Sequence, residues 1–543
     1  MKRNIFFFFA LLIYTVSDAQ SIDEAKKDIY YQRYQSAADV LNKLLTADAN
    51  NLDARYWLGE VYFQQENNEA AKKVLSEGYE YATKNNVSKK DNPLIYIGWA
   101  HLLINEGKTD EAKALLEDVL SESKYKNAEA LLRAARANID SEKGDAAWAL
   151  ELLEKAKKRD KKNPEIYVAA GDAYRKKLDG GNAVLSYNEA LKYDDSYAEA
   201  LYKKGMIYKT QNNKEVYVDN FTKAVQMDST YAPALYELYY HYFYIDLYPA
   251  EKYLNAYLAH SDPSIEQNYM TTDFYYVSRK YQQAVDGAKE IISKEGDKTR
   301  PRLYKLIAYS EASLGDSVNA EKEMEKYFEK QKPEEVVTKD YELMAKLNDI
   351  STGDKSRAIE WYKKALASET KEKEKLAYMG TLANLQKQLG HRNREAAWRE
   401  KIYETKDQPN NLDLYNWGIA LYMAENYIKA DSVFAMYTVK YPDQIYGPLF
   451  QARCNALMDT TMEKGLAVPY YQKLIEVASE KPENNKTYLL SAYGYLGTYE
   501  ANITKDYQAS LDYFQKLLEL DPNNNDAQRY VATLKSWIDK GTK

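Results

Sequence analysis

The stretch from Asn163 to Asp195 reads NPEIYVAAGDAYRKKLDGGNAVLSYNEALKYDD and contains the clearest helical pattern of the chain. In each half, small and aromatic side chains recur at intervals of three and four residues, which places them along one face of a helix. The first stripe consists of Tyr167, Ala170, Gly171 and Tyr174, and the second consists of Ala183, Tyr187 and Ala190. We therefore expect two antiparallel helices that meet along these stripes, with a turn at Gly180-Gly181.

The same pattern returns along the chain with a period of about 34 residues. A small residue on the first helix lets the second helix approach closely, and larger side chains fill the space around that contact. The small residues on the first helices are Gly59, Ala100, Gly171, Gly205, Gly418 and Gly497, and those that open the second helices are Ala71, Ala112, Ala183 and Ala430. One hairpin alone leaves an apolar face uncovered, so neighbouring hairpins are expected to stack in chain order.

The spacing Y-x2-A-G-x2-Y followed by A-x3-Y-x2-A resembles the tetratricopeptide repeat (TPR) family. The resemblance extends over nearly all of the chain after residue 19, and it implies an all-α fold, a TPR-type α-solenoid. The expected form is a right-handed superhelix of about 14 helix-turn-helix repeats, with a C-terminal capping helix over residues 523–540. Related helical-hairpin repeats with looser signatures are the alternative.

The copies of the repeat differ in how closely they follow the pattern. The clearest copies cover residues 92–125, 163–196, 197–230, 411–443 and 485–522. Copies at 265–300, 337–372, 373–408 and 446–482 are degenerate, and their second helices are located by Ala284, Ala288, Ala358, Tyr362, Ala365, Tyr471 and Leu474, with Ala397 as a weaker anchor. We expect one continuous solenoid, divided into an N-terminal and central array at 20–408 and C-terminal repeats plus the capping helix at 409–543.

The first nineteen residues have the pattern of a secretory signal peptide. Lys2 and Arg3 precede a short apolar core at 5–16 (IFFFFALLIYTV), and small residues at 17 and 19 suit a signal peptidase. We expect cleavage after Ala19 and a periplasmic or secreted mature protein. An uncleaved amphipathic start is the alternative. No later stretch is long and apolar enough to span a bilayer, so we expect no integral membrane segment after cleavage.

The composition narrows the classes of function. The formal net charge of -7 disfavours a nucleic acid partner, because phosphates attract clusters of Lys and Arg. The single cysteine, Cys454, excludes an intrachain disulfide and a zinc site built from several cysteines. The four histidines lack metal-ligand spacing, and neither G-x-S-x-G nor a phosphate-binding loop is present. We expect no enzyme activity, metal or cofactor; the alternative is an enzyme whose site follows no sequence pattern.

The resemblance implies a binding groove on the concave face, lined by the first helix of each repeat. The positions one, five and eight residues after the first packing residue face this groove in TPR arrays. Applied to three successive repeats, this rule predicts a partner-binding set of Tyr202, Tyr236, Tyr240, Phe243, Tyr244, Tyr269 and Tyr276. Tyrosine offers a large contact area at low entropy cost, which suits recognition. The alternative is that some of these residues pack between helices, since the chain has 53 tyrosines.

Some TPR domains clamp a C-terminal carboxylate with Lys and Asn at these groove positions. Here the equivalent residues are mixed, namely Tyr56, Glu60, Ile97, His101, Val168, Asp172, Lys305 and Tyr309, so no such clamp is expected. The sequence therefore favours a non-catalytic scaffold of the bacterial cell envelope that binds a protein or an extended peptide. The alternative function is a glycan-binding envelope protein that uses the tyrosine-rich groove.

Overall fold

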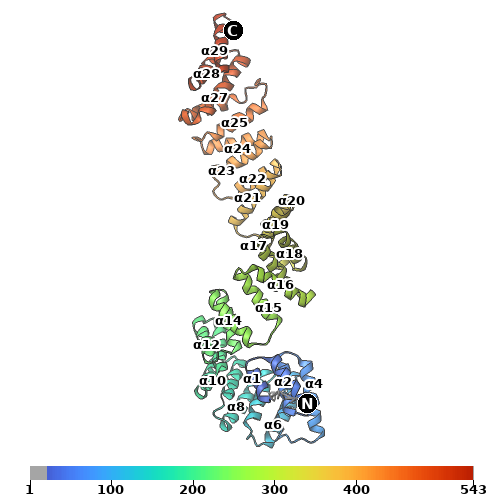
Figure 1. Cartoon of the computed structure of the whole chain (residues 1–543). Helices are drawn as coiled ribbons and strands as arrows, with labels where there is room; N and C mark the ends of the chain where they lie inside the picture. The colour runs from blue at the N-terminus through green and yellow to red at the C-terminus, as the bar shows by residue number, and fades with distance from the viewer. Residues whose placement is uncertain (1–20, 542–543) are drawn as a thin grey trace, which may run out of the picture. The chain divides into compact units, whose positions relative to one another are not determined.

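The computed structural model describes residues 21–541, and the predicted signal peptide lies outside the described residues. The described chain is built from 29 α-helices without a β-strand (Figure 1). It forms two compact units, the first ending at Lys280 and the second beginning at Tyr281. The division predicted between residues 408 and 409 therefore falls inside the second unit.

The helices of the first unit alternate along the chain and are joined by short turns. They are α1 (Ile22–Tyr30), α2 (Tyr34–Ala47), α3 (Leu52–Gln64), α4 (Asn68–Lys84), α5 (Pro93–Asn105), α6 (Thr109–Glu122), α7 (Ala128–Asp140), α8 (Ala146–Arg159), α9 (Pro164–Lys176), α10 (Gly180–Tyr193), α11 (Ala198–Thr210), α12 (Lys214–Met227), α13 (Ala232–Phe243), α14 (Leu247–His260) and α15 (Ile265–Val277).

The second unit continues the alternation and includes short 3-10 segments (η1, η2) and π segments (η3, η4). Its elements are α16 (Tyr281–Glu295), η1 (Gly296–Lys298), α17 (Arg302–Ser313), α18 (Ser317–Lys330), η2 (Pro333–Glu335), α19 (Thr338–Leu347), η3 (Asn348–Thr352), α20 (Lys355–Ser368), α21 (Glu372–Gln388), α22 (Arg392–Thr405), α23 (Asn411–Met423), α24 (Tyr427–Lys440), α25 (Tyr446–Met458), α26 (Val468–Ala478), α27 (Pro482–Tyr499), η4 (Glu500–Thr504), α28 (Tyr507–Leu520) and α29 (Asn525–Asp539).

Within each unit, consecutive helices pack as antiparallel hairpins, such as α9 with α10 and α21 with α22, and successive hairpins of the unit pack on one another. The last helix, α29, packs on α28 and confirms the predicted capping helix. These observations confirm the prediction of an all-α, TPR-type α-solenoid.

Local capping explains where the helices of the 163–195 repeat begin. The Asn163 side chain accepts a hydrogen bond from the Glu165 amide at 3.0 Å, and Pro164 occupies the first turn of α9. The Asp179 side chain caps α10 by accepting from the Asn182 amide. The turn lies earlier than predicted, because Gly180 already belongs to α10 and the left-handed residue is Leu178, with φ of 60°.

The predicted small residues sit where the two helices of a hairpin touch. A Cβ added to Gly171 would lie 2.3 Å from Cε1 of Tyr187, and one added to Gly205 would lie 2.5 Å from Cε1 of Phe221. Gly418 meets Phe434 in the same way, at 2.6 Å. In these repeats the glycine of the first helix packs against an aromatic ring of the second helix, and the ring leaves no room for a methyl group.

Replacing Gly171 by alanine should reduce the local stability of the α9–α10 hairpin by about 1–3 kcal/mol, the usual cost of overpacking. Hydrogen exchange of the amides of both helices measures this loss. Gly380→Ala is the matched control, because a Cβ at Gly380 in α21 meets nothing within 4 Å. That change should instead stabilise its helix by about 0.5–1 kcal/mol. If hydrogen exchange of each substituted hairpin changed equally relative to the wild type in the two variants, this role for Gly171 would be contradicted.

One anchor in the degenerate 373–408 repeat is wrong. Ala396 of α22 is buried, whereas Ala397 is exposed. The position four residues after Ala396 holds the charged Glu400, where the clear repeats place an aromatic ring such as Tyr187 or Phe434. Without that ring the sequence does not define the register of the helix, and the prediction was displaced by one residue.

Candidate partner-binding site

The predicted aromatic residues lie on three helices of the first unit, and their exposure differs widely. Tyr202 belongs to α11, whereas Tyr269 and Tyr276 belong to α15. The other four are Tyr236, Tyr240 and Phe243 on α13 and Tyr244 at its end. Tyr244 is 82% exposed and Tyr269 is 1% exposed, while the remaining five side chains are half-buried.

Four of the seven predicted residues form one aromatic row along α13. The ring centroids of Tyr236 and Tyr240 are 4.8 Å apart, and those of Phe243 and Tyr244 are 4.9 Å apart. The buried ring of Tyr239 connects the two pairs through contacts with Tyr240 and Phe243. The predicted spacing therefore identified neighbouring rings, although the partner that they bind stays a prediction.

Three of the predicted residues, Tyr202 on α11 and Tyr269 and Tyr276 on α15, lie apart from this row. Tyr202 packs against Phe221 and Tyr231, with ring centroids 5.9 and 5.8 Å away. Tyr269 is buried, so its prediction as a contact residue is wrong. Buried side chains on α15 occupy positions 267, 269, 270, 272 and 274, so the helix is covered on more than one side and Tyr269 does not reach a surface.

Sequence reasoning missed two exposed apolar residues, one in the turn after α13 and one in the first turn of α14. Ile245 is 66% exposed and Tyr248 is 83% exposed, next to the predicted Tyr244. We call Tyr244, Ile245 and Tyr248 the α13–α14 edge. Large apolar side chains that gather at one exposed place often mark an interaction site. Apolar residues in a turn that is usually polar were the available signal.

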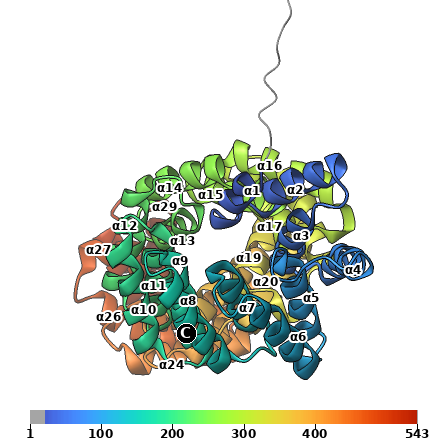
Figure 2. The same ribbon diagram turned by 90° about the horizontal axis from the view of Figure 1, so that it is seen from below.

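The N-terminal segment joins the beginning of the first unit to its end. The Tyr30 ring of α1 lies between the rings of Tyr197 and Tyr231, at centroid distances of 5.5 and 5.3 Å. The Arg33 Nε donates to the His260 carbonyl at 2.9 Å. In Figure 2, α1 and α2 lie next to α14 and α15, although more than 200 residues separate them in the chain.

Further hydrogen bonds fasten the same junction. The Tyr31 hydroxyl donates to Asp228 at 2.8 Å. Asp262 accepts from the Ser36 hydroxyl at 2.6 Å and from the backbone N–H of Gln35 at 2.7 Å, so it caps the start of α2. The expected stacking of hairpins in chain order is therefore not the only packing in this unit, because its first helices also contact its last ones. The unit curves enough for its first helices to meet its last ones.

The inner side of the first unit carries paired charges from successive first helices. Nδ1 of His101 on α5 lies 2.9 Å from Glu60 on α3. Asp172 on α9 accepts from Arg136 on α7 at 2.7 Å and from Lys203 on α11 at 2.9 Å. Three of these residues, Glu60, His101 and Asp172, are predicted groove positions. Here Glu60 pairs with His101, and Asp172 pairs with Arg136 and Lys203, across neighbouring hairpins.

Burial and charge shift the pKa values in this network. Burial alone would lower the pKa of His101, but the Glu60 carboxylate raises it above its ordinary value. Burial alone would raise the pKa of Asp172, but Lys203 and Arg136 hold it well below its ordinary value. Asp172 and Arg136 therefore stay charged at neutral pH.

A cavity of about 480 Å³ lies between α1 and these charged helices. Its lining combines aromatic residues, including Tyr34 and Trp57, with charged residues of both signs, including Arg133 and Glu165. Arg133 pairs with Glu165 at 2.7 Å, so the charges of the lining largely compensate one another. A charged ligand that entered this cavity would therefore have to break existing ion pairs.

The single cysteine of the chain and the possible metal ligands offer no reactive centre in the part that the structure describes. Cys454 in α25 is buried, and burial with the nearby Asp431 raises its pKa to about 12, which suppresses the thiolate. Within residues 21–541, no cluster of three or more His, Cys, Asp and Glu could hold a metal ion. Across those same residues, no helix combines the length and the apolar character needed to cross a membrane.

Comparison with protein families identifies the repeat. Tetratricopeptide repeat models match residues 29–87, 198–231 and 490–524. A model of the ARM repeat of tetratricopeptide repeat protein 21 matches residues 70–174. The chain therefore carries tetratricopeptide repeats, a fold that typically serves as a non-enzymatic scaffold, and no catalytic family was identified. No curated protein matches the chain.

Several solved structures are similar to this chain. The C-terminal part of a TPR repeat-containing protein from Cytophaga hutchinsonii is 27% identical, covers 48% of this chain and 98% of its own, and has a TM-score of 0.32. A tetratricopeptide repeat protein from Parabacteroides merdae is 20% identical, with coverages of 46% and 96% and a TM-score of 0.29. The Cut9–Hcn1 hetero-tetramer is 13% identical, with coverages of 94% and 95% and a TM-score of 0.24. These TM-scores are too low for an argument about function.

Proposed function

We propose that this protein is a non-catalytic scaffold of the bacterial cell envelope, which binds a protein or an extended peptide. The proposed contact surface is the α13–α14 edge together with the half-buried rings of Tyr236, Tyr240 and Phe243. The observation that carries the proposal is the exposure of Tyr244, 82%, and of Tyr248, 83%, beside that row of rings. The TPR fold supports a role in binding macromolecules, and the charged residues on the inner side of the first unit are already paired with one another.

The envelope location rests on the pattern of the first nineteen residues. Cleavage after Ala19 leaves Gln20 as the first residue, directly before Ser21, whose side chain caps α1. The mature chain would then begin next to the helix that closes the first unit. Cell fractionation combined with mass spectrometry of the mature N-terminus tests the location and the cleavage together.

Replacing Tyr244, Ile245 and Tyr248 together by serine should weaken partner binding by at least about tenfold, because exposed aromatic anchors dominate binding energy. The three side chains are exposed, so the helical circular dichroism should be unchanged. The measurement is quantitative mass spectrometry of envelope proteins that the wild type and the variant retain on a column.

Leu178→Ser with Leu185→Ser is the matched control, because these leucines are 94% and 62% exposed on the same unit but lie far from the edge in the sequence. The control should retain the same partner as the wild type. Retention of that partner by the triple variant would refute the proposed surface.

A second candidate function is glycan binding by the same surface. The exposed rings of Tyr244 and Tyr248 support it, because flat aromatic faces can stack on sugar rings. A glycan array read in parallel with the column separates the two functions. Specific glycan signals that the triple variant loses, without any retained protein, would favour the glycan function.

A further inference from the structure

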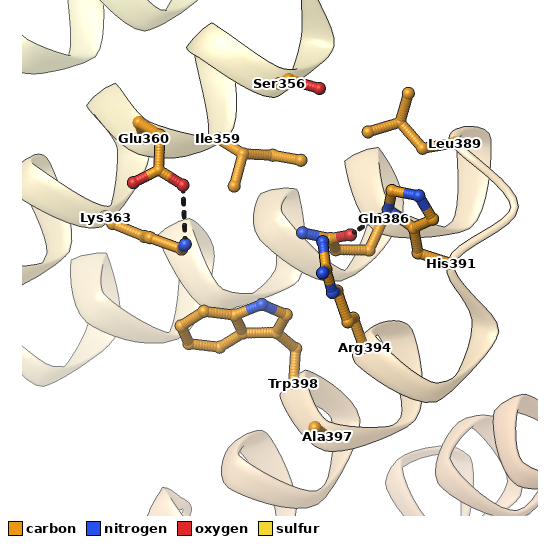
Figure 3. A pocket seen from close by; sticks show the side chains of 10 residues that line it. All are labelled: Ser356, Ile359, Glu360, Lys363, Gln386, Leu389, His391, Arg394, Ala397 and Trp398. Carbon is orange, nitrogen blue, oxygen red and sulfur yellow. Dashed lines mark hydrogen bonds and ion pairs between the residues drawn. The ribbon is translucent and has the colours of Figure 1, made fainter.

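The degenerate repeat at 373–408 leaves a hollow between its second helix and the second helix of the preceding hairpin. The hollow has a volume of about 520 Å³ and is lined by residues of α20, α21 and α22 (Figure 3). The register of α22 buries Ala396 and leaves Ala397 and Trp398 on the side that lines the hollow. The same departure from the repeat pattern that displaced the sequence prediction therefore accompanies an open surface here.

The hollow has an apolar floor and a polar rim. Ile359, Leu389 and Trp398 provide the apolar floor. On the rim, Lys363 donates to Glu360 at 2.8 Å, and the exposed His391 has its Nδ1 3.0 Å from Oε1 of Gln386, which is itself buried (Figure 3). A floor of this kind takes an aliphatic or aromatic side chain, while polar groups at the rim fix its orientation.

Arg394 supplies the uncompensated charge of the rim. Within the part of the chain that the structure describes, Arg394 is exposed and forms no ion pair. The neighbouring Arg392, by contrast, pairs with Glu395 at 2.9 Å. A guanidinium beside an apolar floor complements a carboxylate, because its planar fork binds both carboxylate oxygens.

A second hollow of about 410 Å³ extends the surface beyond Arg394. It shares His391 and Arg394 with the first hollow, and its lining includes Met423 at the end of α23 and Ala424 and Glu425 in the turn that follows. Two hollows that meet at Arg394 suit an extended segment better than a single small molecule. Glu425 at the far end disfavours a run of acidic residues, so one carboxylate next to Arg394 fits best.

We propose that these two hollows form a docking site for a peptide segment of a partner protein in which a leucine-sized apolar side chain precedes a single carboxylate. The apolar side chain occupies the floor formed by Ile359, Leu389 and Trp398, and the carboxylate pairs with Arg394. The site lies in the second unit, so it goes beyond the proposed α13–α14 edge and does not depend on it.

Fluorescence anisotropy with four labelled peptides tests each part of this site on the full-length mature chain. The peptides are GSLEGSG, GSLQGSG without the charge, GSLKGSG with the opposite charge, and GSGEGSG without the apolar side chain. The first should bind about tenfold more tightly than each of the others. For GSLQGSG and GSLKGSG this is the effect of one hydrogen bond to a charged group, and for GSGEGSG it is the effect of one apolar side chain that is no longer buried. Equal affinity for all four peptides, or no binding of GSLEGSG, would overturn the proposal.

Two substitutions separate the charge from the floor. Arg394→Gln should weaken binding of GSLEGSG about tenfold and leave GSLQGSG unchanged, whereas Trp398→Ala should weaken both. Lys387→Gln is the matched control, because Lys387 is exposed on α21 and does not line either hollow. Unchanged affinity in Arg394→Gln would refute the role of the guanidinium.

The same assay distinguishes failure of this site from failure of the proposed function. The variant with serine at 244, 245 and 248 should bind GSLEGSG as the wild type does. Loss of peptide binding in that variant would show that the peptide reports on the α13–α14 edge, and it would overturn the docking site in the second unit.

Discussion

Replacing Asp172 by asparagine should destabilise the first unit by about 3–5 kcal/mol, the cost of removing one partner from a buried ion-pair network. Asp172 is 8% exposed and accepts from Arg136, Lys203 and the Tyr187 hydroxyl. These partners come from α7, α11 and α10, so one carboxylate connects three successive hairpins. Asparagine keeps the shape but removes the nearer countercharge of both cations, which leaves Arg136 with Asp140 at 4.0 Å and Lys203 with Glu199 at 3.8 Å. Hydrogen exchange across α7–α11 measures the loss.

Asp219→Asn is the matched control for this prediction. Asp219 pairs with Lys223 within α12, and both side chains are 52% exposed, so its loss should cost less than about 0.5 kcal/mol.

The pH dependence of stability gives an independent readout of the role of Asp172. The folded-state pKa of Asp172 lies below its ordinary value of 3.8, so its contribution is present above about pH 3.8 and is lost as the pH falls further. The D172N variant should lack that loss, and equal acid sensitivity would contradict the assignment.

Replacing Tyr30 by alanine should open the junction between the two ends of the first unit, at a cost of about 2–4 kcal/mol for a half-buried aromatic side chain. Its ring contacts the rings of Tyr31, Tyr197 and Tyr231, which the substitution leaves facing a void. We expect faster hydrogen exchange in α1 and in the segment that contains Asp228, with little change in α7–α10.

Tyr81→Ala tests whether this response is specific to the junction. Tyr81 lies on α4 and is 37% exposed, so its removal should change exchange only in its own hairpin. A Tyr30→Ala variant whose exchange near Asp228 matches the wild type would show that the long-range contacts do not hold the unit closed. Faster exchange there would show that the Tyr30 ring helps to hold the two ends of the unit together.

The candidate site was partly predictable because helix periodicity is local. Tyr236, Tyr240 and Phe243 follow each other at intervals of four and three residues, which places them on one stripe of α13 in any helix. Their exposure depends on which neighbouring elements cover that stripe, and this is a tertiary property. Tyr269 occupies an equivalent position on α15 but is buried, because α15 is enclosed on more than one side.

The sequence by itself determined the helical hairpin and its stacking, because each contact between Gly171 and Tyr187, or between Gly418 and Phe434, joins residues only sixteen positions apart. Helix period, caps and small residues act within one repeat and recur with it. Only the tertiary structure decided that Tyr30 and Arg33 reach Tyr231 and His260, because curvature accumulates from small rotations at every hairpin and no single repeat encodes the sum. It likewise decided the register of α22, where Glu400 replaces the ring that would have defined it.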